Sequence, residues 1–347
     1  MQNLNGSDGR KSAIGPLVSR RKFLCFGSGA LLGFPLSRAL ADETGRLIFT
    51  HRSTQALGTR IKLSVLHANP GLAETALDEA VSELDRVERL MSIYRPDSQL
   101  SVLNRDGLVE NPDPLFVKVL VRAIAWARRS GGAFDPTVQP LWELFRRAQQ
   151  TGLSPDGQAI EIARVRVGWR RIDVSASRIK LNGDGCALTL NGIAQGFAVD
   201  RVVEVLQQHG VEHGLIDCGE IGAFGSNSTG KPWRIGIQHP RELDSFISIA
   251  ELEGRSMSTS GDYATAFSSD FRSNHIFDPR TGHSPGELAS VTIVAPNATD
   301  ADALSTAVAV LGVERGLALI ESRDQTDGFL VLKQGRALAT KGFPCKA

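Results

Sequence analysis

Apolar side chains recur with two different spacings along the 347-residue chain, one typical of helices and one typical of strands. Between Leu72 and Met91 they return every three or four residues, which places them on one face of a helix. Similar spacing predicts further helices over Pro114–Arg129, Pro136–Gln150, Phe197–Gln208 and from about Asp300 to Leu311. Runs rich in β-branched or alternating residues predict strands at Leu47–Thr50, Thr59–Leu66, Ile172–Val174, Arg178–Leu181, Leu215–Cys218, Trp233–Gln238 and Phe329–Leu332.

These helices and strands interleave without a fixed order. A doubly wound sheet needs a regular strand–helix–strand repeat, and the chain has neither that repeat nor any other internal period. The pattern therefore predicts one α+β domain with a mixed β-sheet core and flanking helices.

The first 41 residues have the pattern of an export signal. Arg20 and Arg21 precede the short apolar run Cys25–Leu36, and Ala39-Leu40-Ala41 is a small-x-small cleavage site. A membrane anchor is the alternative, but this run of 12 residues is shorter than the ~20 needed to span a bilayer. We expect residues 1–41 to be a twin-arginine signal peptide, residues 42–347 to be the mature domain, and the protein to act in the bacterial periplasm.

Composition narrows the classes of partner. The formal net charge of +1 gives no reason to expect nucleic acid. No later segment is as long and apolar as a membrane span, so we expect a protein that is peripheral to the membrane at most. Cleavage removes Cys25 and leaves Cys186, Cys218 and Cys345, an odd number without Cys-x-x-Cys spacing. A zinc site or a disulfide framework is not expected, although a single disulfide bridge remains an alternative.

Asp302 and Thr306 lie four residues apart on the helix expected from about Asp300 to Leu311, so both side chains share one face. Carboxylate and hydroxyl oxygens are the hard ligands that Mg²⁺ prefers. The alternative is structural: Asp302 would cap its own helix, and Thr306 would bond back to a carbonyl of the preceding turn. Spacing alone favours the alternative.

His275 lies in a turn punctuated by Pro279 and Gly282, and histidine is the side chain best suited to take a proton near neutral pH. Upstream, Ser258-Thr259-Ser260-Gly261 has the hydroxyls of a nucleophile but no histidine–acid partner in a recognisable hydrolase order. We expect those hydroxyls to bind a ligand.

Two glycine-containing segments are candidate ligand loops. In Gly131–Pro136 a glycine pair permits close approach to a ligand and Asp135 offers acceptor oxygens, although ordinary helix caps explain the same residues. In Asn191–Arg201, glycines open a helix whose N–H groups suit phosphate, although close helix–sheet packing explains them equally. Neither segment is a dinucleotide-binding fingerprint.

Taken together, these motifs resemble the ApbE family of FAD-dependent flavin transferases, which attach FMN to a threonine of a target protein. Further matching segments are Leu57-Gly58-Thr59, Met91–Ser98 and Lys231–Ile237, so the likeness covers nearly all of the expected mature chain in the family's order. A closer likeness is to the exported, NosX-like branch associated with nitrous-oxide reductase maturation, because Gly219-Glu220-Ile221 and Asn191–Gly196 resemble its variants.

The resemblance implies a role for each matching residue. FAD, as substrate, would be contacted by Leu57, Tyr94, Ala133, Phe134, Asp135, Thr189, Gln195 and Phe277. Mg²⁺ would be bound by Asp302, by Thr306 and by a main-chain oxygen near Gly192, and His275 would deprotonate the acceptor threonine. The acceptor would be a flavoprotein of a respiratory or electron-transfer complex. An FAD carrier without chemistry and an FAD pyrophosphatase are the alternative functions.

Overall fold

An eight-stranded sheet forms the centre of the molecule. The computed structural model describes residues 46–345, so the expected signal peptide lies outside the described residues. The strands follow the order β1 (Ile48–Ala56), β2 (Thr59–His67), β6 (His213–Asp217), β7 (Ile221–Phe224), β10 (Ser256–Gly261), β11 (Leu288–Ala295), β12 (Asp327–Leu332) and β13 (Ala337–Ala339). Each neighbouring pair is antiparallel.

Two smaller sheets accompany the central one. β8 (Trp233–Gln238) and β9 (Phe246–Leu252) form a ribbon, whose side chains pack with those of β7, β10, β11 and β12 in a buried apolar cluster. β3 (Leu108–Glu110), β5 (Arg178–Leu181) and β4 (Ile172–Val174) form the other sheet, at one end of the molecule. The ribbon closes the sheet face that the long helices leave open.

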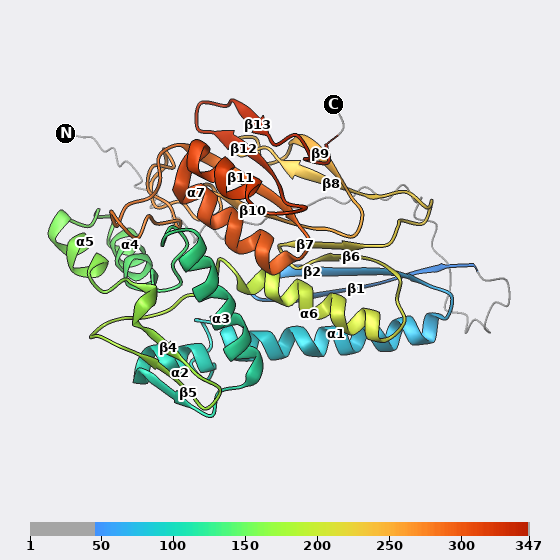
Figure 1. Cartoon of the computed structure of the whole chain (residues 1–347), viewed down its shortest axis with the longest axis horizontal. Coiled ribbons are helices and arrows are strands. Elements are labelled where there is room, and N and C mark those ends of the chain that lie inside the picture. Colours follow the sequence, from blue (N-terminus) through green and yellow to red (C-terminus); the bar gives the residue numbers. More distant parts are fainter. Residues whose placement is uncertain (1–45, 346–347) are drawn as a thin grey trace, which may run out of the picture.

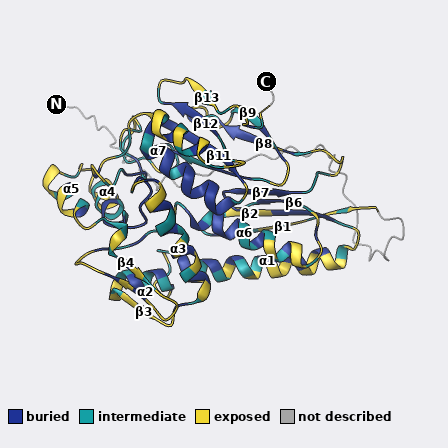
Figure 2. Ribbon diagram, viewed as in Figure 1, coloured by how far each residue is buried: buried dark blue, intermediate teal, exposed yellow. Residues whose placement is uncertain are grey.

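Three long helices cover one face of the central sheet: α1 (Pro70–Met91), α6 (Ala194–Gln208) and α7 (Ala298–Glu321) (Figure 1). Their buried sides form the main core with the sheet, and Figure 2 shows this dark stripe most clearly along α7. The expected α+β class, with sheet core and flanking helices, is confirmed.

Local sequence signals explain where helix α1 begins. The Asn69 side chain accepts hydrogen bonds from the amides of Gly71 and Leu72 at 2.9 and 3.2 Å, and Pro70 needs no amide at the first position. The buried positions of α1 keep the helical spacing from Ala73 to Met91.

The remaining helices are α2 (Gln99–Asp106), α3 (Pro114–Arg129), α4 (Gln139–Thr151) and α5 (Gly157–Arg164), followed by a 3₁₀ turn, η1 (Trp169–Arg171). Helices α2 and α5 have only eight residues each and were not predicted from the sequence. Helix α4 begins three residues after the predicted start at Pro136, because Asp135 folds the segment before it into a turn. Helix α6 begins at Ala194, three residues before the expected start at Phe197.

Helix α7 is longer than expected, because it continues beyond a break at Gly312 (φ 78°, ψ −173°). Glu287 stabilises the break by accepting a hydrogen bond from the Val313 amide at 3.0 Å. By length and composition alone α7 could cross a membrane, contrary to the expectation from sequence. It packs instead against β10, β11 and α6. A buried core helix can have the same length and apolar composition as a membrane-spanning helix.

The three cysteines in the described part of the chain are free thiols. Burial raises the pKa of Cys186 to about 11, and burial raises that of Cys218 well above its usual value. Cys345 is exposed. The disulfide that the sequence left open is therefore not formed.

Candidate active site

A cavity that is partly open to solvent lies where α6, α7 and β10 meet the loops that carry Ala133, Thr189 and His275. Its lining contains most of the candidates from sequence: Ala133, Phe134, Asp135, Thr189, Gly192, Gln195, His275, Phe277, Asp302 and Thr306. Residues as far apart as 133 and 306 therefore face one space.

Leu57 and Tyr94 are not in that lining. Leu57 (φ 52°) and Gly58 (φ 73°) form the tight turn between β1 and β2, and the Leu57 amide donates to Glu88 on α1 at 3.2 Å. Tyr94 is 71% exposed in the loop after α1. Neither touches the cavity, so a role for either in ligand binding stays a prediction.

The Asp302 carboxylate belongs to α7 but binds α6. Its Oδ2 accepts a hydrogen bond from the Gly196 amide at 3.0 Å, one of the first-turn amides of α6 that lack a partner within the helix. The cap of α7 itself is Asn297, whose side chain accepts from the Asp300 amide at 2.9 Å. The structural alternative for Asp302, capping of its own helix, is therefore wrong.

Thr306 lies one turn further along α7 and faces β10. Its Oγ1 is 3.1 Å from Ser260 Oγ. A side-chain carbon added to Gly192 would lie 3.0 Å from the same hydroxyl, so the backbone there passes very close. Ser305, not Thr306, bonds back to the carbonyl of Asp302. Carboxylate, hydroxyl and main chain thus come together at one end of the cavity.

A second carboxylate ties the two helices together in the opposite direction. Asp200 on α6 accepts hydrogen bonds from the amides of Ala298 and Thr299, at the start of α7, at 2.7 and 2.9 Å. Burial raises the pKa of Asp200, although these hydrogen bonds act to lower it. Each helix therefore supplies a carboxylate to the amino end of the other.

His275 lies in the long loop between β10 and β11. Its Nδ1 is 3.2 Å from the Thr265 carbonyl, and its amide donates to that carbonyl at 3.0 Å. A neutral ring that donates from Nδ1 carries its lone pair on Nε2, so Nε2 is the basic atom. The arrangement suits a proton acceptor at the cavity.

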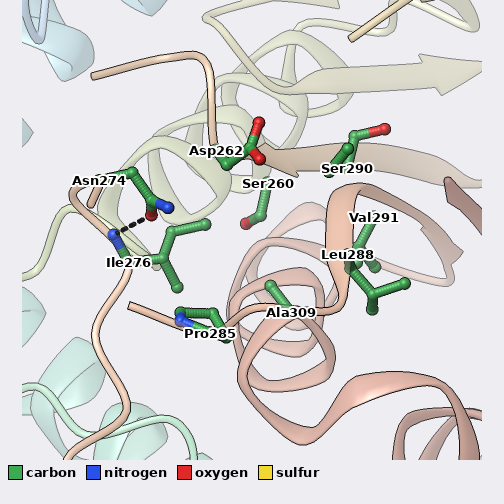
Figure 3. Close-up of a pocket in the computed structure, with 10 residues that line it drawn as sticks. Ser260, Asp262, Asn274, Ile276, Pro285, Leu288, Ser290, Val291 and Ala309 are labelled. Carbon is green, nitrogen blue, oxygen red and sulfur yellow. Dashed lines mark hydrogen bonds between the residues drawn. The ribbon is translucent and has the colours of Figure 1, made fainter. Parts of the chain in front are cut away.

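The neighbouring Asn274 holds this loop in place (Figure 3). Its side chain is 1% exposed; its Oδ1 accepts from the Ile276 amide at 3.0 Å and its Nδ2 donates to the Phe271 carbonyl at 3.1 Å. The Asn274 amide also donates to Ser284 Oγ at 2.9 Å. The backbone on both sides of His275 is therefore fixed by hydrogen bonds.

The base of the same loop is held by charge. Asp262, 3% exposed, accepts two hydrogen bonds from Arg241 at 2.7 and 2.9 Å and lies 3.5 Å from Lys333 Nζ. The Arg241 guanidinium also lies 4.4 Å from the Phe271 ring centre, and Lys333 donates to the Phe271 carbonyl. The loop is thereby anchored to β12 and to the β8–β9 ribbon.

Asp135 lines the cavity but uses its oxygens within the protein. Oδ1 accepts from the amide and hydroxyl of Thr137 at 2.8 and 2.6 Å, and Oδ2 accepts from the Trp169 amide at 2.9 Å. Burial raises its pKa against these hydrogen bonds. Asp135 shapes the loop but does not cap α4 as the structural interpretation predicted, because the N-cap of α4 is Val138 and, among residues 46–345, no side chain caps that helix.

Phe277 is also a packing residue. It is 3% exposed, and its ring centre lies 5.0 Å from that of Phe145 and 6.2 Å from that of Phe267. This aromatic cluster joins the loop of His275 to α4. Phe277 therefore forms part of the cavity wall and holds the wall to its support.

Gln195 and Thr189 lie on the α6 side of the cavity. Thr189 Oγ1 accepts from the Asn191 amide at 3.2 Å, and the Gln195 amide group lies against Gly219 (φ 91°). Next to Gly219, the buried Glu220 also lines the cavity and accepts from the Thr259 amide at 3.2 Å. Glu220 was not among the candidate site residues.

The other lining residues are Pro136, Val138, Trp142, Asn191, Thr259, Ser260 and Ile276. Thr259 and Ser260 lie in the hydroxyl run for which the sequence predicted ligand binding. The sequence did not mark Trp142 as a site residue, because an aromatic residue in an amphipathic helix is ordinarily part of the core.

Within residues 46–345 no group of three or more His, Cys, Asp or Glu side chains is placed to hold a metal ion. A metal here would depend on hydroxyl and main-chain oxygens beside Asp302. The oxygens of Asp302, Thr306 and the Gly192 segment are of the kind that suits Mg²⁺ and not zinc.

The fold and this site define a flavin transferase architecture, and comparison with known proteins identifies the family. The ApbE family model matches residues 57–330. The chain belongs to the ApbE family.

Curated relatives and solved structures agree with this assignment. A FAD:protein FMN transferase of Haemophilus influenzae is 32% identical over 320 residues, covering 88% of this chain and 92% of its own. One of Klebsiella pneumoniae is 30% identical over 299 residues, with 82% and 85% covered. The flavin transferase ApbE of Vibrio cholerae has a TM-score of 0.75 at 28% identity (86% and 98% covered). The apo flavinyl transferase ApbE of Pseudomonas stutzeri has 0.75 at 30% (86% and 97%).

Proposed function

We propose that this protein is a Mg²⁺-dependent FAD:protein FMN transferase, which moves FMN from FAD to a threonine or serine hydroxyl of a target flavoprotein and releases AMP. The observation that carries the proposal is the convergence of Asp302, Thr306 and Gly192 on the cavity that His275 also lines. Membership of the ApbE family and the names of the relatives support the reaction class.

The donor set fits a hard divalent cation. Asp302 is 4% exposed, and a buried carboxylate is stable when charge or hydrogen bonds compensate it. Asp302, Thr306 and a main-chain oxygen near Gly192 would hold Mg²⁺. When bound, Mg²⁺ supplies charge neutralisation for the pyrophosphate of FAD as its P–O–P bond breaks.

His275 would act on the acceptor. Its Nε2 takes the proton of the threonine hydroxyl, whose oxygen forms a bond to the phosphorus of the FMN half. The bond from that phosphorus to the bridging oxygen breaks, and AMP leaves with the electron pair. The reaction needs no nucleophile from this chain and no electron transfer, because FAD is consumed as a substrate.

The remaining cavity residues would bind FAD. We propose that Ala133, Phe134, Thr189, Gln195 and Phe277 contact it directly, because their side chains or backbone line the cavity. Asp135 would act mainly by holding the loop that carries Phe134, since its oxygens accept hydrogen bonds from Thr137 and Trp169.

The site of action is also a proposal. The twin-arginine pattern in residues 1–41 supports export, and the acceptor would then be an electron-transfer flavoprotein that presents a flexible loop to the periplasm. Cell fractionation of the full chain, and of a variant with Arg20 and Arg21 replaced by lysine, tests export. Equal periplasmic amounts of the two would contradict the twin-arginine route.

The transfer reaction is tested with residues 42–347, FAD, Mg²⁺ and a candidate acceptor, by mass spectrometry of the acceptor and by measuring AMP. We expect an FMN phosphoester on threonine, lost on chelation of Mg²⁺. AMP formed equally fast without an acceptor would indicate an FAD pyrophosphatase, and bound FAD without AMP would indicate a carrier.

His275→Ala tests the base, and His283→Ala is the matched control, since His283 is an exposed histidine of the same loop outside the cavity lining. We expect His275→Ala to bind FAD normally and to lose about 10²–10⁴-fold in transfer rate, as is usual for a general base. Transfer by His275→Ala at the rate of the control would refute its role.

A further inference from the structure

An arginine-rich stretch of the chain surrounds the cavity loops. Residues 128–171 contain eight arginines and four carboxylates, a net charge of +4, whereas the whole chain carries only +1. The stretch runs from the end of α3 through α4 and α5 to η1, and α4 and α5 form one end of the molecule (Figure 1). Positive charge is therefore concentrated in this stretch of the chain.

Five of these arginines are exposed and form no ion pair with a carboxylate in the described part of the chain: Arg128, Arg129, Arg146, Arg166 and Arg170. We call this set the arginine face. By contrast, Arg147 pairs with Glu143 and Arg164 with Glu161. Among residues 46–345, therefore, no salt bridge neutralises the charge of the arginine face.

Tryptophan rings, not carboxylates, position four of these guanidinium groups, and one of them is Arg129, 5.4 Å from the ring centre of Trp126. Arg146 lies 5.3 Å from the ring centre of Trp142, which lines the cavity. Arg170 and Arg128 lie 4.3 and 5.9 Å from the ring of Trp169. Stacking holds a guanidinium in place while leaving its N–H groups available to an anion.

The arginine face borders the cavity at two points. One is Trp142 itself. The other is Trp169, whose amide donates to Asp135 in the cavity wall and whose Nε1 lies near Gly132. A polypeptide that brings a hydroxyl into the cavity from this end must therefore pass close to unpaired guanidinium groups.

We propose that the arginine face docks an acidic segment of the acceptor protein, with Asp or Glu residues close to the threonine that receives FMN. The inference rests on the proposed function and adds to it the charge of the acceptor segment that the protein would bind. Complementary charge at the edge of a site accelerates encounter and favours the partners that carry the opposite sign. A polypeptide suits the position better than a lipid surface, because a bilayer lying on this face would obstruct the cavity entrance that the acceptor needs.

The test uses three synthetic peptides with the same central threonine, flanked by Asp and Glu, by Asn and Gln, or by Lys. Binding of each peptide to the FAD-loaded protein is measured by fluorescence anisotropy, and FMN attachment by mass spectrometry. The proteins are the wild type, R146E/R170E and, as control, R336E in the turn between β12 and β13, where Arg336 is exposed. R146Q/R170Q provides a milder second variant.

We expect the wild type and R336E to bind the acidic peptide about three- to tenfold more tightly than the neutral one, as two exposed charge contacts allow. R146E/R170E should reverse that order, R146Q/R170Q should abolish it, and FAD affinity should not change. Raising salt from about 0.02 to 0.15 M should weaken the wild-type preference.

Three results would overturn the docking surface: no preference in the wild type, the same preference in R146E/R170E, or loss of FAD affinity in that variant. Binding of wild type but not R146E/R170E to anionic phosphatidylglycerol vesicles, with unchanged peptide preference, would assign the face to a membrane and also overturn it. A different result would contradict the proposed function: the peptides bind as expected, but no acceptor protein receives FMN.

Discussion

Gly196→Ala should damage the site by forcing α6 and α7 apart. Gly196 lies in the first turn of α6, where an added side-chain carbon would lie 2.2 Å from the Ala298 carbonyl oxygen and 2.8 Å from Asp302 Cβ. Both neighbours belong to α7. The backbone that must yield is tied in turn to Asp200, so it cannot move alone.

The structure sets the size of the effect. The helices must separate by about 1 Å to restore normal contact, and overpacking of this kind costs about 1–3 kcal/mol. Alanine regains about 0.5–1 kcal/mol of helix propensity over glycine, so the net loss is about 0–2.5 kcal/mol. The Asp302–Gly196 hydrogen bond lengthens with the separation, and misplacement of a reacting group by about 1 Å can cost 10²-fold in rate.

Denaturant unfolding and the Mg²⁺ dependence of transfer measure the two consequences. Gly157→Ala is the matched control: Gly157 is also in the first turn of a helix, α5, but an added carbon there meets nothing within 4 Å. We expect Gly157→Ala to be neutral or slightly stabilising and fully active. A Gly196→Ala protein as stable and as active as the control would refute the proposed close contact between the helices.

Three further outcomes are expected. Thr306→Val should keep the fold to within about 1 kcal/mol, the cost of one hydrogen bond, but raise the Mg²⁺ concentration needed for transfer at least about tenfold; an unchanged Mg²⁺ titration contradicts this. Arg122→Met should destabilise by about 1–2 kcal/mol at pH 7, because Arg122 bonds to Asp300 with both carboxylate oxygens. Burial raises the pKa of Asp300, but hydrogen bonds from Arg122, Asn297 and Trp126 lower it below 3.8 overall. The stability that the Arg122–Asp300 pair contributes is therefore complete above that pH and is lost as the pH falls through the lowered pKa. A stability difference between Arg122→Met and the wild type that persists in acid contradicts this. A disulfide-exchange reagent at pH 8 should titrate one thiol, Cys345, in folded residues 42–347 and three after denaturation; three fast thiols in the native state contradict this.

The sequence predicted what local signals determine. The cap formed by Asn69 and Pro70 marks the start of α1 because both act on amides within three residues. The spacing of Asp302 and Thr306 places both side chains on the same side of α7 whatever surrounds the helix. The same kind of signal was too weak for α2 and α5, since a helix of two turns carries too few apolar positions to show a period.

What the sequence could not predict depends on contacts between distant segments. Nothing near Asp302 indicates that its carboxylate binds the amide of Gly196, which is 106 positions away. Asp135 offered free acceptor oxygens in sequence, yet Trp169 and Thr137 use them in the fold. The family resemblance predicted that distant segments meet, and His275, Asp302 and Thr306 do line one cavity. Trp142 and the arginine face could be recognised only from the structure.

Helices α6 and α7 each place a carboxylate at the amino end of the other, and this arrangement determines which substitution can identify a metal ligand. Asp302 serves two purposes, because one of its oxygens stabilises the amino end of α6 while its carboxylate lines the cavity. Removing Asp302 therefore loses a helix cap worth about 1 kcal/mol together with any bound ion, and an inactive variant would not separate the two. Among residues 46–345, the Thr306 hydroxyl hydrogen-bonds only to Ser260, and Ser260 keeps a second partner, Ser305, at 2.8 Å. A higher Mg²⁺ requirement of Thr306→Val, with the fold intact, is therefore the more direct evidence for a metal site.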